Sequence, residues 1–334
     1  LNGRYAVEGS GTEYPSGIQA KVMMEATGQN FAGEVVHKLG IHGSLSDGQF
    51  VLDALSVDHS VADIVVKGQV DLIKSKAKLR LTTDIANASS LSKYGAEGLA
   101  GSIRFGGDVM AGWDPEVSAD VNGELAINRF KGPGITVSTI AGPIAAKVRG
   151  DAAEGSGTIT LTGLDASGTT IDAIRLDFEG GQGADGGIAV GAEVGIGLIE
   201  MPDGQFDMEG LAGKLVATIP SDGELAATAN LDVRSFRFGD EDYKVDGGPV
   251  VFSMIGDDIK ADIDLRREDA PFLVGKIRGD MDSGDWKVEG FRFAVLKDKG
   301  LNAEQNIRFR LSENGAEDVQ FQLVNADGNG SLSI

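Results

Sequence analysis

Gly181, Gly183 and Gly186 have the spacing G-x-G-x-x-G, which in dinucleotide-binding proteins joins a strand to a helix and holds a pyrophosphate. The helix must begin at the third glycine, because its first backbone N–H groups bind the phosphates. Here Gly187–Gly191 follows, a segment of glycine and small or branched apolar residues that favours loop or strand. We therefore expect a flexible loop at this motif and no nucleotide cofactor.

The three histidines, His37, His42 and His59, are the residues best suited to bind a transition metal or to act as a general base. His37 and His42 are five positions apart, which on a strand places them on opposite faces, unable to share a metal ion. Asp58, His59 and Ser60 have the residue types of a hydrolase triad. Adjacent strand residues point apart, however, whereas a nucleophile and its base must lie within hydrogen-bonding distance. We expect neither a metal site nor catalysis.

Two acidic turns are candidates for cation binding. One holds Asp280, Asp282 and Asp285, and the other is the run Asp240–Asp242. Calcium prefers several oxygen ligands at defined spacing, closed by a bidentate glutamate. Neither turn has that set, so we expect solvated hairpin tips.

The composition of the chain limits the classes of molecule that it can bind. The chain has 334 residues with 30 Lys and Arg against 51 Asp and Glu, a formal net charge of −21. Such a surface repels nucleic acid and anionic membrane surfaces. Cysteine is absent, which excludes disulfides and thiolate chemistry. No apolar run reaches the length of a membrane-spanning helix, and we find no signal peptide. The chain begins at Leu1 and ends at Ile334 within an alternating stretch. We therefore expect it to be a mature form or a piece of a longer protein.

A two-residue alternation places the side chains along most of the chain. Ile307, Phe309 and Leu311 alternate with Arg308 and Arg310, and similar segments recur from end to end. Successive residues of a strand face opposite sides, so each such segment has an apolar and a polar face. Asp-Gly and Asn-Gly pairs separate the segments, and 49 glycines with 6% aromatic residues suit many strands joined by tight turns. The pattern predicts about 20 mostly antiparallel strands.

Two segments break the alternation. Asn87–Glu97 carries Leu, Tyr, Ala and Ser and predicts one or two helical turns, whereas Gly180–Gly197 is glycine-rich and predicts a loop. We therefore divide the chain into residues 1–184 and 185–334, two parts of one elongated sheet. The string Glu-Gly-Leu-Ala-Gly occurs at residues 97–101 and 209–213, which indicates either a degenerate repeat or chance in a Gly- and Ala-rich chain.

The segment 63–86 reads Asp-Ile-Val-Val-Lys-Gly-Gln-Val-Asp-Leu, then Ala-Lys-Leu-Arg-Leu-Thr-Thr-Asp-Ile-Ala from residue 77. Gly98–Gly101 and Val117–Ile127 follow. This succession of "Gly-x-Val-x-Leu" and "Leu-x-Leu-x-Asp" phrases resembles the bacterial AsmA-like proteins, in particular the TamB and YdbH groups. The resemblance is clearest over Asp63–Phe178, extends in style over most of the chain, and includes no catalytic motif.

The resemblance implies an all-β fold: an elongated, mostly antiparallel sheet curled lengthwise into a hydrophobic groove, the β-taco, with few or no helices. It further implies a non-enzymatic conduit that carries phospholipids across the periplasm of a Gram-negative bacterium, with acyl chains in the groove. An inner-membrane anchor absent from this chain and an outer-membrane barrel or lipoprotein partner belong to the same expectation. No cofactor and no nucleic acid are implied.

The inward members of the best strands are our candidate groove residues. They are Leu79, Leu81, Leu125, Ile127, Ile159, Leu161, Ile174, Leu176, Phe178, Leu231, Val233, Phe291, Phe293, Val295, Phe309, Leu311, Phe321 and Leu323.

Alternation indicates that a face is covered but does not indicate what covers it. A structural or adhesive solenoid or sandwich with a dry core is therefore the alternative to a lipid groove. A carbohydrate-active enzyme would need paired carboxylates beside an aromatic platform, for which Trp113 and Trp286 are the available tryptophans.

Overall fold

The computed structural model describes most of the chain. The described residues are 3–11, 13–31, 34–94, 98–166, 168–183, 186–200, 206–221, 223–238, 241–244, 247–268, 270–296, 299–303, 306–312, 315–320, 322–325 and 331–333.

These residues form strands almost throughout, with one short 3₁₀ helix, η1. The elements in chain order are β1 (Gly3–Gly11), β2 (Ile18–Phe31), β3 (Glu34–Ser46), β4 (Gln49–His59), β5 (Asp63–Asp71), β6 (Lys76–Ile85), η1 (Ala88–Tyr94), β7 (Ala100–Gly112), β8 (Ser118–Gly132), β9 (Ile135–Arg149), β10 (Ala152–Ala166), β11 (Thr169–Gln182), β12 (Ile188–Glu200), β13 (Phe206–Ile219), β14 (Ala226–Phe238), β15 (Glu241–Lys244), β16 (Pro249–Ile255), β17 (Asp258–Arg267), β18 (Ala270–Asp280), β19 (Asp285–Leu296), β20 (Lys299–Ala303), β21 (Ile307–Ser312), β22 (Gly315–Gln320), β23 (Gln322–Asn325) and β24 (Ser331–Ser333).

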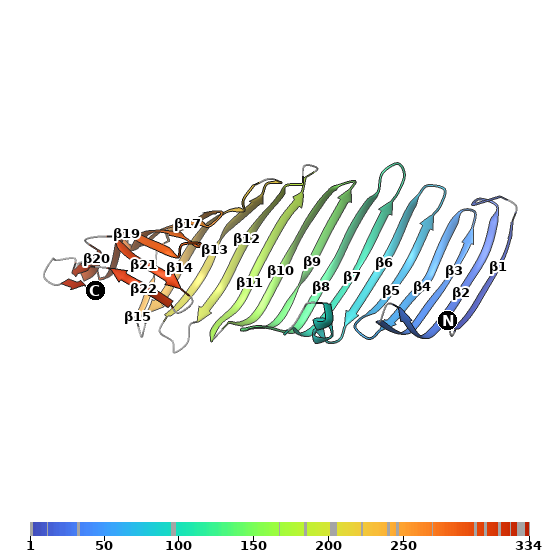
Figure 1. The fold of residues 1–334 in the computed structure, drawn as a ribbon, viewed down its shortest axis with the longest axis horizontal. Helices are drawn as coiled ribbons and strands as arrows, with labels where there is room; N and C mark the ends of the chain where they lie inside the picture. The colour runs from blue at the N-terminus through green and yellow to red at the C-terminus, as the bar shows by residue number, and fades with distance from the viewer. Residues whose placement is uncertain are drawn as a thin grey trace. The chain divides into compact units, whose positions relative to one another are not determined.

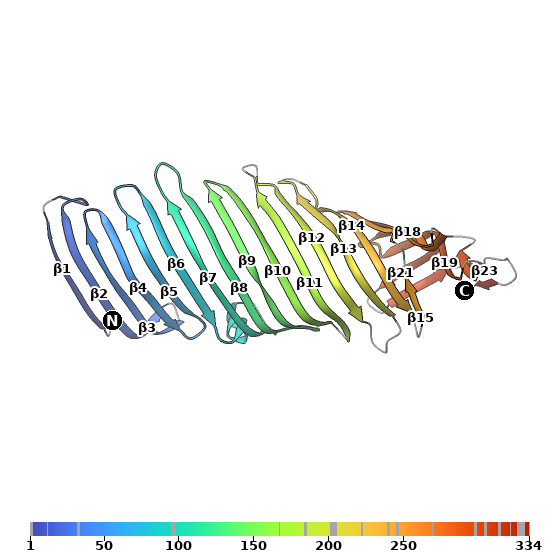
Figure 2. The same ribbon diagram turned by 180° about the vertical axis from the view of Figure 1, so that it is seen from behind.

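The chain divides into two compact units, unit 1 (Leu1–Ser167) and unit 2 (Gly168–Ile334). In unit 1, each strand from β1 to β10 pairs antiparallel with the next, so the chain forms a simple up-and-down meander. Figures 1 and 2 show these strands side by side in chain order. Short turns between long strands account for this topology, since antiparallel neighbours need only tight connections.

Unit 2 begins in the same way and then branches. Strands β11 to β14 form a meander, and β14 pairs with both β15 and β16. The ladder continues through β17 and β18 to β19, which pairs with β20 and with β21. All pairings are again antiparallel.

The predicted fold class is therefore confirmed: an all-β protein built from antiparallel strands as an open, curled sheet. Figures 1 and 2 show that the long strands of unit 1 bow along their length. Register shifts occur in several ladders, for example between Leu52 and Leu55 of β4 and between Ala100 and Ser102 of β7. Such bulges bend a strand and increase its twist, which accounts for the curvature. The short helix predicted within Asn87–Glu97 is η1.

The predicted glycine-rich loop over Gly180–Gly197 is wrong. Its residues belong mostly to β11 and β12, and only a short turn separates the two strands. Gly180 permits close strand approach, because a Cβ there would lie 2.6 Å from the carbonyl oxygen of Ala189, whereas a Cβ at Gly195 or Gly197 would meet no atom within 4 Å. The unit boundary after Ser167 accordingly lies before this segment and differs from the expected position at residue 184.

Unit 2 has a compact apolar core. Val233, Leu265 and Phe272 are buried together, with Phe272 only 1% exposed. The Phe272 and Phe293 rings meet edge to face, with centroids 5.4 Å apart and planes at 75°. Aromatic pairs in this geometry add to the stabilisation from buried area. These side chains come from β14, β17, β18 and β19, so the core packs β14 together with three consecutive strands further along the same ladder.

Replacing Phe272 by alanine is expected to lower the free energy of unfolding of unit 2 by about 3–5 kcal/mol, because the substitution leaves a cavity in a dry core. Urea unfolding followed by Trp286 fluorescence, in a Trp113→Phe background, reports on unit 2. The control is Val251→Ala, whose side chain is 38% exposed. It is expected to cost less than about 1 kcal/mol. Equal costs for the two substitutions would contradict a core centred on Phe272.

Candidate apolar binding face

The strand registers of unit 1 place its apolar side chains in continuous rows. Residues directly opposite in neighbouring antiparallel strands share a face of the sheet. One row crosses five strands, from β6 to β10, and consists entirely of branched aliphatic residues: Ile85, Ile103, Ile127, Ile140 and Leu161. Its neighbouring rows contain Leu79, Leu81 and Leu125, and Ile159 shares the face of Leu161 on β10. All six groove candidates of unit 1 therefore lie on one face.

Over most of the strand length the same face continues to the other strands of unit 1 without a charged residue. Following the registers from β1 to β10, its members there are glycine, alanine, valine, isoleucine, leucine, phenylalanine, Met24, Thr83 and Tyr5, and the row of Val36 at one end adds Gln29 and His59. We call this surface the apolar face. Ten strands about 4.8 Å apart give it a width of roughly 43 Å across the strands.

The opposite face of unit 1 carries the charges. Arg104 donates to Asp84 at 2.8 Å, and Arg149 binds both carboxylate oxygens of Asp120 at 2.7 and 2.8 Å. Lys147 lies opposite Asp120 in the ladder. These pairs are exposed and individually weak. Their consistent placement nevertheless identifies this face as the one in contact with water.

The apolar face is only half covered. Leu79, Leu81, Leu125 and Ile127 are of intermediate burial, whereas Ile159 is buried. The extensive contacts of unit 1 are between ladder neighbours, and η1 contacts β7. A sheet face covered by a second protein layer has fully buried side chains. The intermediate burial therefore indicates that much of the apolar face has no such layer among the described residues.

Aromatic rings lie over glycines on this face, a feature that the sequence pattern alone did not indicate. Gly107 and Gly123 are directly opposite each other, and a Cβ on either would lie within 2.9 Å of the Phe105 ring. A Cβ at Gly43 would likewise lie 2.6 Å from the ring of Phe50. The rings thus lie flat against the sheet, which keeps the face smooth and compensates for the missing glycine side chains. A glycine two residues from an aromatic residue on the same strand, as Gly107 is from Phe105, is the sequence pattern that could have indicated this packing.

Gly107→Ala is expected to lower the free energy of unfolding of unit 1 by about 1–3 kcal/mol, since the new methyl group displaces the Phe105 ring and crowds the β8 backbone. Its matched control is Gly106→Ala, because a Cβ at Gly106 meets no atom within 4 Å. That change is expected to be neutral or stabilising by up to about 1 kcal/mol, since alanine loses less backbone entropy. Urea unfolding followed by Trp113 fluorescence in a Trp286→Phe background distinguishes the two. Similar effects would contradict the packing of Phe105 over Gly107.

The candidates of unit 2 lie in two settings. Ile174, Leu176 and Phe178 of β11 are half-buried and oppose apolar residues or alanine of β12. Leu231 is half-buried, whereas Val233 is 3% exposed and belongs to the core around Phe272. The β11 residues therefore resemble those of unit 1, and Val233 is a core residue.

The remaining candidates lie nearer the end of the chain. Phe293 packs against the core, and Phe291 is half-buried. Phe309 stacks on Trp286, with centroids 6.3 Å apart and planes at 7°. Phe321 lies outside the described residues. Val295, Leu311 and Leu323 belong to β19, β21 and β23, and the surroundings of their side chains are likewise outside what the structure describes.

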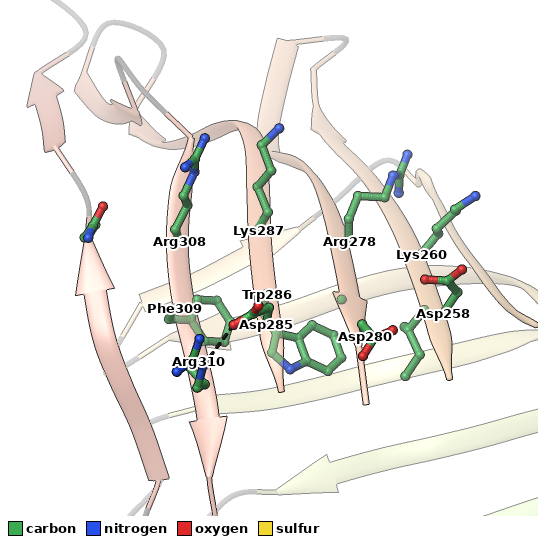
Figure 3. A pocket seen from close by; sticks show the side chains of 13 residues that line it. Asp258, Lys260, Arg278, Asp280, Asp285, Trp286, Lys287, Arg308, Phe309 and Arg310 are labelled. Carbon is green, nitrogen blue, oxygen red and sulfur yellow. Dashed lines mark hydrogen bonds and ion pairs between the residues drawn. The ribbon is translucent and has the colours of Figure 1, made fainter. Parts of the chain in front are cut away.

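A cleft of about 600 Å³ lies in unit 2 near Trp286 and Phe309. Figure 3 shows it bordered by carboxylates and by a series of cationic side chains. Asp285 accepts a hydrogen bond from Arg310 at 3.0 Å. Backbone and side-chain hydrogen bonds from Ser283 hold the pKa of Asp280 below its ordinary value, which keeps this carboxylate ionised and unsuited to act as a general acid. Trp113 is 42% exposed and does not line this cleft.

The other chemistry-bearing residues are not assembled into a site. His42 lies 3.7 Å from Glu25, and His59 Nδ1 accepts a hydrogen bond from the backbone N–H of Val61 at 3.2 Å. Within the described residues, no three His, Cys, Asp or Glu side chains gather closely enough to hold a metal ion. Asp240 of the second acidic turn lies outside the described residues. No described helix is long and apolar enough to cross a membrane.

Comparison with known proteins gives no relative: no family model, no curated protein and no solved structure matches the chain.

Proposed function

We propose that this protein is a non-enzymatic lipid-binding protein whose apolar face holds the acyl chains of phospholipids. The observation that carries the proposal is the apolar face of unit 1, which extends over ten neighbouring strands without a charged side chain and is only half covered. Acyl chains match such a surface because they need continuous apolar contact and no hydrogen-bonding partner. A protein partner would commonly bring polar groups that require partners of their own.

The free energy available on this face is sufficient for lipid binding. Each methylene group removed from water contributes about 0.8 kcal/mol, so ten methylene groups contribute about 8 kcal/mol before the cost of ordering the chain. The rows of Leu, Ile and Val that include Leu79 and Ile127 supply the contact. The rings of Phe105 and Phe50 lie over glycines and so add to the apolar contact area without standing away from the sheet.

The location and partners of the proposed function follow from the resemblance of Asp63–Phe178 to AsmA-like proteins. On this proposal the protein acts in the periplasm of a Gram-negative bacterium and carries phospholipid between the inner and outer membranes. A membrane anchor on another segment and an outer-membrane barrel or lipoprotein partner would complete the path. The open, curled antiparallel sheet of each unit is the architecture that such a conduit requires.

A structural protein with a dry core is the second candidate, and the core of unit 2 favours it. Val233, Leu265 and Phe272 are buried against one another, as expected for a dry core. On this alternative the remaining apolar surface is closed by other protein, and no lipid binds.

Photo-crosslinking tests the lipid proposal at adjacent residues of one strand. The photoreactive residue p-benzoylphenylalanine replaces Leu125, on the apolar face, or Glu124, on the polar face of β8. The purified full chain is incubated with vesicles of phosphatidylethanolamine and phosphatidylglycerol, irradiated, and analysed by mass spectrometry. We expect phospholipid adducts at residue 125 and none at residue 124, because neighbouring strand residues face opposite sides.

Native mass spectrometry of the unmodified chain provides the independent measurement, and bound phospholipid is the expected result. Equal labelling at the two positions would indicate nonspecific contact with vesicles. An unliganded mass together with no adduct at residue 125 would favour the dry structural protein.

A further inference from the structure

Four cationic residues stand directly opposite one another on neighbouring strands of unit 2. The registers align Lys260 of β17 with Arg278 of β18, Arg278 with Lys287 of β19, and Lys287 with Arg308 of β21. Figure 3 shows the four side chains on adjacent strands with their charged ends towards the same side of the view. We call these residues the cationic row. At a strand spacing of about 4.8 Å the row is roughly 14 Å long.

This arrangement is costly in the absence of a ligand. Like charges directly opposite in a sheet repel each other, and the row contains three such pairs in succession. In one adjacent row the charges alternate, because Asp262 lies opposite Lys276, which lies opposite Glu289, whereas in the other adjacent row Asp258 lies opposite Asp280. A run of four cations is therefore unexpected in a chain with 30 basic and 51 acidic residues.

The two inner cations are partly neutralised, and the two outer cations are not. Arg278 lies 2.8 Å from Asp262, and Lys287 lies 2.5 Å from Glu289, whose pKa is lowered mainly by its hydrogen bond from Lys287. In the part of the chain that the structure describes, neither Lys260 nor Arg308 has a carboxylate within ion-pair distance, and both are exposed.

The row borders the cleft of about 600 Å³ that contains Trp286 and Phe309. Asp258, Asp280 and Asp285 also border this cleft, and of these Asp285 is paired with Arg310. Gln320, opposite Arg308, adds an amide at the end of the row. The cleft therefore combines the cationic row and an amide donor with a neighbouring row of carboxylates, each two residues from a cation on the same strand, and its lining includes the stacked aromatic pair.

We infer that the cationic row binds a phosphate group, either as the head group of a phospholipid or as a soluble phosphate ester. Guanidinium groups bind phosphate oxygens through two parallel hydrogen bonds, and lysine ammonium groups add compact positive charge. A phosphate beside Arg308 and Lys260 supplies the negative charge that these two residues lack, and it relieves the repulsion along the row. The inference concerns the polar wall of unit 2 and holds whether or not the apolar face of unit 1 binds acyl chains.

Calorimetric titration of the full chain with glycerol 3-phosphate and with dihexanoyl phosphatidic acid, below its micelle concentration, tests the site. The variant is Lys260→Gln with Arg308→Gln, which removes the two unpaired cations. Its matched control is Lys67→Gln with Arg80→Gln, which removes one lysine and one arginine that lie opposite each other on β5 and β6, outside the cationic row. We expect the first variant to bind about tenfold or more weakly, since it loses charge-assisted hydrogen bonds, and the control to bind as the native protein does.

The two probes distinguish the sources of the phosphate. Comparable affinities indicate a site for the phosphate group alone, whereas tighter binding of phosphatidic acid indicates a lipid head group whose acyl chains also make contact. Binding of neither probe, or equal weakening in both variants, would overturn the inference.

A thermal melt gives a second readout, because it measures the stability of the folded protein and not the heat of binding. Phosphate should raise the melting temperature of the native protein above its value in chloride of equal ionic strength, because a ligand that binds the folded state stabilises it. The Lys260→Gln, Arg308→Gln variant should melt no lower than the native protein without phosphate, since like-charge repulsion is relieved, and should lose the phosphate effect. A retained phosphate effect in this variant would also overturn the inference.

Discussion

The structure depends on the register between antiparallel strands. Backbone hydrogen bonds fix which residues stand opposite each other, and a shift of one residue would move every apolar side chain of a strand to the wet face. In unit 1 this register holds Ile85, Ile103, Ile127, Ile140 and Leu161 in one row across five strands. The ladder supplies the stability that a second covering layer supplies in a sandwich, and it leaves the apolar face half covered.

The period-2 pattern was sufficient to predict the fold class. Where apolar and polar residues alternate strictly, as in β6 and β8, the predicted face agrees with the register. The six candidates of unit 1 share one face of the sheet because no bulge separates them from their neighbours on the ladder. Alternation carries this information because the pleat permits only two directions for a side chain.

The structure differs from the sequence-based expectations in the glycine-rich segment and in the burial of some apolar residues. Gly180–Gly197 was predicted to be a loop because glycine is common in turns, whereas most of the segment is strand and Gly180 allows close contact between β11 and β12. Val233 and Phe293 were grouped with half-covered residues such as Leu125, although they pack at the core. Alternation cannot distinguish these settings, because the covering atoms of a core come from strands that are distant in the sequence. The cationic row was missed for the same reason, since Lys260 and Arg308 become neighbours only through the intervening strands.

A surface with almost no hydrogen-bonding side chains has little means of selecting its ligand by chemical group. Dispersion and the exclusion of water act on any hydrocarbon of suitable cross-section, so chain length and stiffness would decide occupancy more than chemical identity. Material bound at the apolar face should therefore be heterogeneous, with a composition that follows the lipids around it. Selectivity, where the protein has any, must arise at polar groups away from that face.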